Sequence, residues 1–250
     1  MTAREPNPNL ALVSTNRAGQ NRLLSLLPMD ERQRLLSRCK RTPFESGDVL
    51  YPEKGDITDV YFPLSGIVSL VLSEKETAGS VEIAMIGNEG VVGIPIFLGA
   101  AKSPTKALWQ AAGEALRMPA THFANELDGS ATLRRAVGRY AQALQHHMAQ
   151  SLVCNAYHTV DQRLCRWLLM SRDRVGADEL PLTQEFIAQM LGVRRPSVTI
   201  AAGALQTAGL IRYRRGYIRV QDRAGLEAGS CECYRVLCAA YEALLSEKFS

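Results

Sequence analysis

The chain has 250 residues, of which 46% are hydrophobic and 22% are charged. This composition is that of a folded globular protein with two domains or one large domain, and it excludes an intrinsically disordered chain. The net charge is only +4, so overall charge is no indication of nucleic-acid binding. The sequence has neither a long apolar run nor the layout of a signal peptide. We therefore expect no membrane segment and a cytoplasmic protein whose cysteines are reduced thiols.

The first half of the sequence passes from helical to strand patterns. Residues 1–19 are expected to form a mobile arm, and residues 20–41 one or two short helices. From residue 42 to residue 118, short apolar runs alternate with glycine-containing turns. Such a series predicts a jelly-roll β-barrel, which we place in a domain of residues 20–130. The candidate strands are 49–51, 60–62, 67–72, 81–86 and 107–118.

Apolar residues then recur at steps of three or four from 131 to 157, which predicts one long helix. The apolar stripe of this helix consists of Leu133, Val137, Tyr140, Leu144, Met148 and Leu152. A stripe between two domains favours packing against the same helix of a second chain, so residues 131–158 are interpreted as a dimerisation helix. The alternative is that the stripe packs on the barrel of its own chain. A further helix is predicted over residues 160–174.

Residues 183–220 have the pattern of two helices followed by a hairpin. Thr183 can cap the first helix, Gly192 relieves the backbone in the turn, and Pro196 is tolerated in the first turn of the second helix. Gly209 is placed to end that helix. Apolar and basic residues then alternate around Arg215 and Gly216, as in a small hairpin. This order predicts a winged helix-turn-helix, placed at residues 159–224.

The outward face of this motif is basic. No acidic residue lies between Glu185 and Asp222, and a local excess of cations is what phosphate binding needs. The alternative is a helical hairpin with a solvated basic face. The residues expected to contact DNA are Thr183, Gln184, Arg194, Arg195, Ser197, Thr199, Arg212, Arg214 and Arg215. Residues 225–250 are assigned to a C-terminal helix running from about residue 232 to residue 247.

Barrel, long helix and winged helix-turn-helix, in this order, resemble the Crp/Fnr family of bacterial transcription regulators. The motifs that carry the resemblance are FESGDVLYPEKGD, YFPLSGIVSLVL and TQEFIAQMLGVRRPSVTIAAGALQTAGLI. The resemblance covers roughly residues 30–220. It implies an α+β protein that binds double-stranded DNA as a homodimer and is controlled by a signal sensed in the barrel. It also names RNA polymerase as a candidate partner and implies that the chain is not an enzyme.

The sequence departs from the cyclic-nucleotide members of that family. Their phosphate-binding cassette has a Gly-Glu pair and an arginine, whereas here Gly93 is followed by Ile94, and no arginine lies between Arg41 and Arg117. We therefore expect a signal other than cyclic AMP, and a cyclic-nucleotide-responsive regulator with a diverged cassette is the alternative. The effector-pocket candidates are Glu89, Gly93, Lys102 and Lys106. Glu82 and Glu89 could contact an effector, but glutamates at turns are more often solvated.

Other family features are also missing. The recognition-helix positions that hold a glutamate and an arginine in cyclic-AMP-type operator readers are Pro196 and Ile200 here, so the operator cannot be transferred from the family. Iron–sulfur members have clustered N-terminal cysteines, but Cys39 is alone before Cys154. The barrel strands have no histidine, which disfavours haem and a cupin-type metalloenzyme.

The remaining cysteines are expected to be inert. Cys231 and Cys233 lack the usual zinc spacing of CxxC, and no histidine follows them. If both lay on a helix together with Cys238, Cys233 would point away from the other two. Buried or idle thiols are therefore favoured over a metal or redox site. Cys154 and Cys165 are interpreted as packing residues. The sequence thus predicts no metal and no cofactor.

Overall fold

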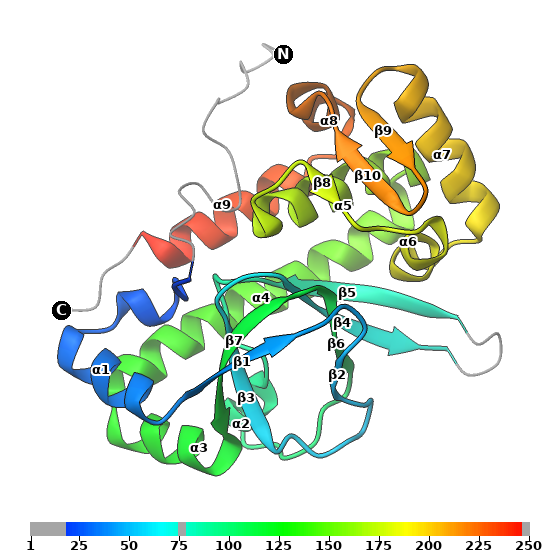
Figure 1. Cartoon of the computed structure of the whole chain (residues 1–250). Helices are drawn as coiled ribbons and strands as arrows, with labels where there is room; N and C mark the ends of the chain where they lie inside the picture. Colours follow the sequence, from blue (N-terminus) through cyan, green and yellow to red (C-terminus); the bar gives the residue numbers. More distant parts are fainter. Residues whose placement is uncertain (1–18, 75–78, 247–250) are drawn as a thin grey trace.

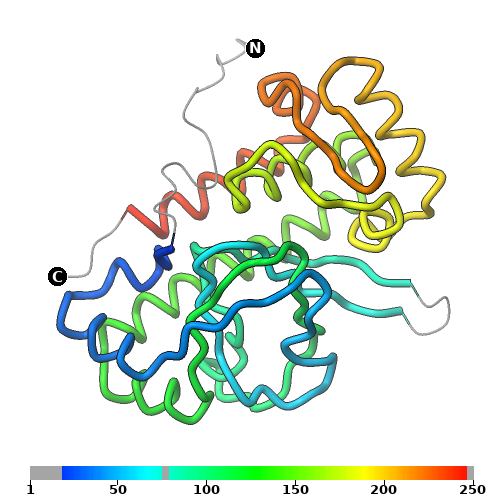
Figure 2. The backbone as a smooth tube through the Cα atoms, in the orientation of Figure 1, coloured from blue at the N-terminus to red at the C-terminus, as the bar shows by residue number. Residues whose placement is uncertain are grey.

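The computed structural model describes residues 19–74 and 79–246. The expected N-terminal arm and the expected helix end at residue 247 lie largely or wholly outside these ranges. A lower part built on two sheets and an upper, helical part are joined by a long helix (Figures 1 and 2). The described chain begins with a 3-10 turn at Leu24–Leu26 and helix α1 at Met29–Ser37, as expected for residues 20–41.

The lower part contains two antiparallel sheets. One has the strand order β1-β7-β3 and the other β2-β6-β4-β5. Large side chains such as Phe62 and Trp109 are buried between them, and Phe44 stacks on Trp109 with 5.0 Å between ring centroids. This arrangement confirms the predicted jelly-roll class. The strands are β1 (Lys40–Phe44), β2 (Val49–Tyr51), β3 (Asp59–Pro63), β4 (Ile67–Ser73), β5 (Ser80–Ile86), β6 (Lys106–Ala111) and β7 (Gly113–Pro119).

Three elements of this part were not predicted. Strand β1 contains Pro43 and two basic residues, so it lacks the apolar alternation that marks a half-buried strand. Helix α2 (Ile94–Phe97) is a single turn, too short to show a helical period. Helix α3 (Ala120–Gly129) immediately follows strand β7. The predicted run 107–118 is divided into two strands in different sheets.

Two long helices connect the sheets to the upper part. Helix α4 spans Ala131–Tyr157 and begins at the Ser130 side chain, which accepts a hydrogen bond from the Leu133 amide at 2.9 Å. Helix α5 spans Val160–Val175 and begins with a capping box formed by Thr159 and Gln162. Gly176, with φ +72°, ends it. Both helices lie where the sequence predicts them.

The apolar stripe of α4 packs largely on its own chain. Leu133, Val137, Tyr140 and Leu144 are buried, whereas Leu152 is 72% exposed. The alternative weighed from the sequence therefore holds for the first four stripe positions, because the sheets and α3 cover them. In the C-terminal half of the helix, the apolar residues Leu152, Val153 and Tyr157 remain exposed.

The upper part contains the two-helix motif and the hairpin. Helices α6 (Gln184–Leu191) and α7 (Arg195–Thr207) are followed by strands β9 (Ile211–Arg214) and β10 (Tyr217–Val220), and the short strand β8 (Glu179–Leu180) pairs with β10. Helix α8 (Arg223–Gly229) was not predicted. Helix α9 (Cys233–Leu245) returns along α4 (Figure 1), where the Tyr241 hydroxyl lies 3.1 Å from His147 Nδ1.

Buried polar contacts join the two parts. The Trp167 indole in α5 donates a hydrogen bond to Glu82 in β5 at 2.9 Å, and Arg174 forms an ion pair with Glu89 at 2.8 Å in which both side chains are fully buried. The expectation that these two glutamates are solvated is wrong, because α5 packs on Glu82 in strand β5 and on Glu89 in the turn that follows. Among the described helices, none combines the length and the apolar character that crossing a bilayer requires.

Candidate nucleic-acid interface

The two helices of the motif are set by local signals that the sequence shows. The Thr183 hydroxyl accepts a hydrogen bond from the Phe186 amide at 3.1 Å and so caps α6. Gly192 adopts φ +61° in the turn, a conformation that a side chain disfavours. Helix α7 then begins at Arg195 with Pro196 in its first turn. Its inner face, formed by Val198, Ala201, Ala202 and Leu205, is buried as predicted.

The outer face of α7 presents four exposed side chains, Arg194, Arg195, Thr199 and Ile200, beside half-buried Ser197. The Thr199 hydroxyl donates to Gln184 Oε1 at 2.8 Å, so the two helices hold each other's polar side chains in place. Ile200 is 74% exposed although it is apolar. In the sequence, Ile200 stands out only as a departure from a family position, and it was missed as a contact residue. Its place one turn after Pro196 on the outer face is the signal that could have revealed it.

The hairpin is a two-residue type I′ connection. Arg215 has φ +40° and Gly216 φ +86°, and Arg214 pairs with Tyr217 across the strands. Two positive φ values match the turn to the twist of the strands. Glycine adopts this conformation freely, whereas arginine does not. The hairpin therefore holds a guanidinium at its tip in a disfavoured backbone conformation.

Positive charge gathers on this surface without internal compensation. Arg212 and Arg219 stand directly opposite each other in the β9–β10 ladder, where like charges repel. Arg194, Arg195, Arg212, Arg214, Arg215 and Arg219 are all exposed, and none of them forms an ion pair within residues 19–74 and 79–246. Such a surface is complementary to a polyanion.

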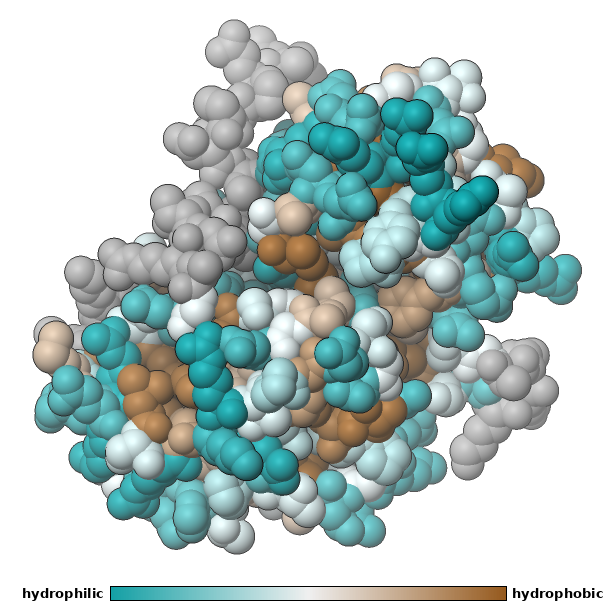
Figure 3. Space-filling model, viewed as in Figure 1, coloured by the Kyte–Doolittle hydropathy of each residue, from teal (hydrophilic) through white to brown (hydrophobic). Residues whose placement is uncertain are grey.

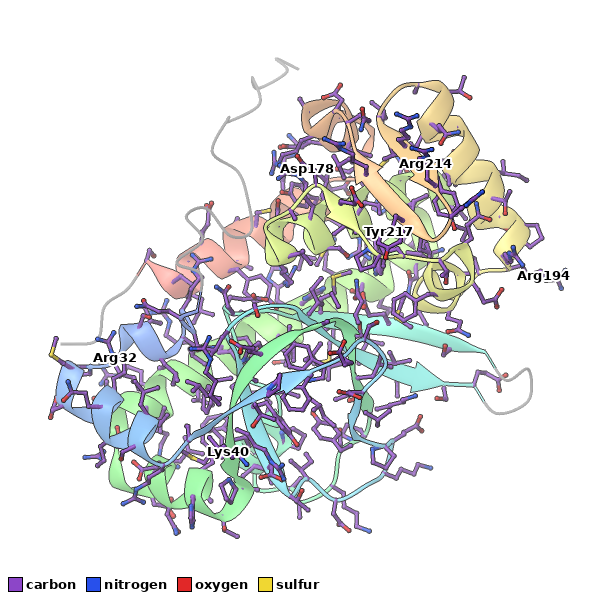
Figure 4. The ribbon with its side chains drawn as sticks, in the orientation of Figure 1. Arg32, Lys40, Asp178, Arg194, Arg214 and Tyr217 are labelled. Atoms are coloured by element: carbon purple, nitrogen blue, oxygen red, sulfur yellow. The ribbon has the colours of Figure 1, made fainter. Side chains whose placement is uncertain are left out.

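Figure 4 shows two of these arginines, Arg194 and Arg214, in the upper part. Arg194 lies at the start of α7, and Arg214 and Tyr217 lie on the wing beside it, away from Arg32 and Lys40 (Figure 4). In the space-filling view, hydrophilic side chains gather over the wing (Figure 3). A helix with exposed polar side chains and a basic hairpin on one side is the geometry with which winged helix-turn-helix domains contact a duplex.

Comparison with known proteins supports this geometry. Residues 162–228 match the model of the Crp-like helix-turn-helix domain. FixK2 from Bradyrhizobium japonicum has a similar fold, with a TM-score of 0.65 and 16% identity over 77% of this chain and 98% of that one. The c-di-GMP responsive global regulator CLP from Xanthomonas campestris has a TM-score of 0.64 and 15% identity over 78% of this chain and 100% of that one.

A transcriptional regulator of the CRP family from Thermus thermophilus gives a TM-score of 0.64 and 16% identity over 76% of this chain and 96% of that one. The matched motif and the shared fold along most of the chain agree. Residues 162–228 form a Crp-like helix-turn-helix domain, and most of the chain shares the fold of solved Crp/Fnr-type regulators. No curated protein matches it.

The helix-turn-helix motif lies against the β4–β5 hairpin of the sheet domain. A groove of about 1020 Å³ separates the β4–β5 hairpin from α6 and the start of α7, and Arg194 and Arg195 contribute to its wall. Gly192 and Val81 both line the groove, and a Cβ built on Gly192 would be 3.1 Å from Val81 Cγ2. The recognition helix therefore begins shortly beyond a close contact with β5.

The structure does not bring the four effector-pocket candidates together. Gly93 lines a cavity of about 130 Å³ whose other walls include Tyr51, Ser103 and Leu144 and no charged side chain. Glu89 instead holds Arg174, and Lys102 lies 3.9 Å from Asp56 with both side chains mostly exposed. Lys106 lies in β6 and does not contribute to this cavity.

Two buried groups have shifted protonation equilibria. Burial raises the pKa of Glu82 to about 7, although Ser69 and Trp167 donate hydrogen bonds to it. Burial, together with Arg174 and Arg166, lowers the pKa of His147 well below its ordinary value. The sequence did not predict that Glu82 and His147 lie at the contact between the two parts. Only the fold brings β5, α4 and α5 together.

The geometry predicted for the cysteines is wrong. Cys231 precedes α9 instead of lying on it, so its thiol and that of Cys233 point to the same place. Cys154, expected to be a packing residue, lies at that place with its Sγ 3.6 Å from Cys231 Sγ. Cys238 lies apart from them, in the main hydrophobic core.

Proposed function

We propose that this chain is a Crp/Fnr-type transcriptional regulator that binds specific DNA operators as a homodimer and changes its DNA affinity in response to a signal received by the sheet domain. The division is that expected from the sequence, with an arm at 1–19, a sensor domain at 20–130, a dimerisation helix at 131–158, a winged helix-turn-helix at 159–224 and a C-terminal helix at 225–250. The observation that carries the proposal is the set of exposed arginines on α7 and on the wing, which form no ion pair with any residue that the structure describes.

Each group on this surface has an assigned role. Arg195 reads a base, because a guanidinium can bind guanine through two hydrogen bonds. Ile200 contacts a thymine methyl group, which is the apolar feature of the major groove. Thr183, Gln184, Arg194, Ser197 and Thr199 contact bases or neighbouring phosphates at the entry of α7. Arg212, Arg214 and Arg215 contact the backbone from the wing.

Selection of bound sequences from random DNA with the purified full chain tests this proposal. A palindromic consensus is expected, with half-sites one or two helical turns apart, because a two-fold dimer reads two identical half-sites. Repeating the selection in the presence of cell extract shows whether a ligand is required. Binding that remains equal for all sequences at physiological salt, by a monomeric chain, contradicts the proposal.

The second chain is proposed to bind at the C-terminal half of α4. Leu152, Val153 and Tyr157 are exposed there, with Tyr157 82% exposed. Large apolar side chains grouped on an exposed helix are typical of a protein interface. Cytoplasmic localisation, contact with RNA polymerase and the absence of enzymatic activity belong to the same proposal and rest on the regulator family.

The signal is proposed to be something other than cyclic AMP. A buried cyclic phosphate requires a counter-charge, preferably an arginine with its paired donors, and the cavity beside Gly93 has no charged side chain in its wall. Its volume of about 130 Å³ is also below the roughly 300 Å³ of small ligand pockets. Either a small apolar molecule or a change of contacts at the α5 interface fits this site better than a nucleotide.

Calorimetric titration of the full chain with cyclic AMP, cyclic GMP and cyclic di-GMP tests this assignment. We expect no saturable heat in the micromolar range, where binding would release about 8 kcal/mol of free energy. Micromolar, saturable binding of any of the three supports the alternative of a diverged cyclic-nucleotide cassette. Exchange of Lys102 and Lys106 for alanine then identifies whether those lysines hold the phosphate.

A further inference from the structure

Four side chains that are far apart in the sequence converge where α4 ends and α9 begins. They are Cys154 in the last turn of α4, His158 at its C-cap, Cys231 in the turn before α9, and Cys233 at the first position of α9. One ligand atom from each lies within 4.8 Å of all the others. The three thiols are buried, and the imidazole is 14% exposed.

The distances are those expected around a single tetrahedral ion. Cys154 Sγ lies 3.6 Å from Cys231 Sγ, and Cys233 Sγ lies 3.4 Å from His158 Nδ1. With metal–sulfur bonds of about 2.3 Å and metal–nitrogen bonds of about 2.0 Å, the ligand atoms of a tetrahedral zinc site stand about 3.5–3.8 Å apart. Ligands of an iron–sulfur cluster bind different irons and are therefore spread more widely than this group.

The surroundings fit a site that holds a metal. The Gln150 side-chain amide lies 3.0 Å from Cys233 Sγ and can donate to a thiolate. His158 presents Nδ1 to the thiols, and its Nε2 lies 3.6 Å from Glu232 Oε2. A carboxylate behind a metal-bound histidine is a common outer partner that fixes the ring.

The charged side chains near the cluster also favour a bound metal ion. Arg163 and Arg166 of α5 are buried beside the thiols, and the Nε atom of each has no hydrogen-bond partner. Among the described residues, no carboxylate forms an ion pair with either guanidinium. Three neutral thiols leave these buried cations uncompensated, whereas a zinc ion with three thiolates and one imidazole carries one negative charge.

We propose that Cys154, His158, Cys231 and Cys233 bind one zinc ion, which fastens the end of α4 to the start of α9. Soft thiolate ligands in a closed tetrahedron select zinc among the common divalent ions. Four protein ligands leave no open coordination position, so the ion has a structural role. The site lies next to Tyr157, at the end of α4 where the second chain is proposed to bind. It is independent of that proposal, because all four ligands belong to one chain.

Metal analysis of the full chain tests the proposal. The protein is purified under reducing conditions without a histidine tag or a metal column, and its metal content is measured by mass spectrometry. About one zinc ion per chain is expected after dialysis. Cys154→Ser and Cys233→Ser are expected to retain less than about a tenth of it. Cys238→Ala is the matched control, since Cys238 is a buried thiol of the same helix outside the cluster, and it retains the ion.

The histidine position gives a sharper comparison. His158→Cys keeps four ligands and is expected to retain zinc, whereas His158→Ala is expected to lose it. Glu232→Ala keeps all ligands and weakens zinc binding about tenfold, as loss of an outer partner does. If the serine variants fail to fold, the absorption spectrum of the unmodified chain loaded with cobalt tests the site instead. Thiolate-to-cobalt charge-transfer bands together with tetrahedral d–d bands appear only if the thiols bind the ion.

Three results overturn the proposal. They are a folded chain without metal and without cobalt bands, six freely reactive thiols in that chain, and a Cys154–Cys231 disulfide found by peptide mass analysis. DNA binding is measured on the same samples. A chain that contains zinc but does not bind DNA separates failure of the proposed function from failure of the zinc site.

Discussion

Glu82 is the residue at which the sheet β2-β6-β4-β5 and α5 share a buried hydrogen-bond network. Its carboxyl group accepts from Trp167 Nε1 at 2.9 Å and lies 2.6 Å from Ser69 Oγ, which lies 2.8 Å from Gln110 Oε1. Gln110 in turn donates to Ser171 of α5 at 3.1 Å. A protonated Glu82 donates to Ser69 and lets the serine donate to Gln110, so the neutral form completes the network.

This network predicts a pH-dependent stability. The pKa of Glu82 rises from 4.5 to about 7 on folding because the side chain is buried, with Ser69, Trp167, Arg166 and Arg174 opposing the shift. Between these values the folded chain holds a proton that the unfolded chain releases, so this contribution to stability falls as pH rises from 4.5 to 7. The full loss amounts to about 3 kcal/mol at most.

Glu82→Gln mimics the protonated side chain and removes that dependence. We expect the variant to be more stable than the parent by about 1–3 kcal/mol at pH 8 and equal to it near pH 4.5. Urea denaturation followed at both pH values measures the difference. A stability gap that stays constant between them means that Glu82 does not titrate in this range. Ser73→Ala, on the same hairpin but exposed, is the control and leaves the pH profile unchanged.

Arg195 is predicted to specify one base pair of the operator. Arg195→Ala is expected to weaken binding to the selected operator by about 1–3 kcal/mol and to relax preference at that base pair. The measurement is a titration against operator variants changed one position at a time. Arg214→Ala serves for comparison, because removing a phosphate contact of the wing lowers affinity equally for all variants. A uniform decrease for Arg195→Ala assigns it to the phosphates as well.

The wing is an element in which charge and backbone preference conflict. Arg215 occupies a left-handed conformation at the tip, next to Gly216, where asparagine or glycine is the preferred residue. The hairpin therefore has a positively charged side chain at its tip, between the two strands. This conflict is expected where a residue serves binding instead of stability.

Arg215→Asn separates the two effects. The unfolding free energy is expected to rise by about 1 kcal/mol, because asparagine tolerates the left-handed region. The slope of log affinity for DNA against log salt is expected to fall in magnitude by about 0.9, the value for a single phosphate contact. Lys40→Asn, an exposed basic position on β1, is expected to leave the salt slope unchanged. An unchanged slope for Arg215→Asn removes this residue from the interface.

The elements differ in how far the sequence predicts them. Strong periodicity and clear caps located α4, α5, α6 and α7 within one or two residues, and Arg215-Gly216 located the wing turn. Strand β1 and the short helices α2 and α8 carry no such signal. The partners of the predicted elements could not be predicted, because the stripe of α4 is equally suited to its own sheets and to a second chain. Burial in the structure decides between them for Leu133 through Leu144.

The DNA surface and the cysteine cluster show the same difference at the level of a site. The arginines of α7 and the wing lie within 26 residues of one another, from Arg194 to Arg219, so local pattern was enough to group them. Cys154 and Cys231 are 77 positions apart and meet only because α9 folds back along α4. Glu89 and Arg174, 85 positions apart, form their ion pair only because α5 packs on the turn after β5. The spacing of residues in the sequence does not predict contacts between such distant positions.

At the scale of the whole molecule, the C-terminal half of α4 is the predicted contact between two chains. Leu152→Glu is expected to convert a dimer into a monomer, because it places a carboxylate in an apolar contact that has no charged partner. Size-exclusion chromatography with light scattering measures the mass. Met29→Glu, at a position 66% exposed on α1, is the control and keeps the dimer mass. A dimer that persists in Leu152→Glu places the interface elsewhere.

The polar contacts that α5 makes with the sheet domain have a consequence for engineered chimeras. Trp167 and Arg174 lie within residues 162–228, which match the helix-turn-helix domain, yet their partners Glu82 and Glu89 lie in the sheet domain. In a hybrid that joins the sheet domain of another protein to this chain at the α4–α5 boundary, the buried guanidinium of Arg174 and the indole N–H of Trp167 therefore lose their partners. Transplanting both glutamates together with the foreign sensor, or moving the junction beyond α5, is the modification that lets such a biosensor fold.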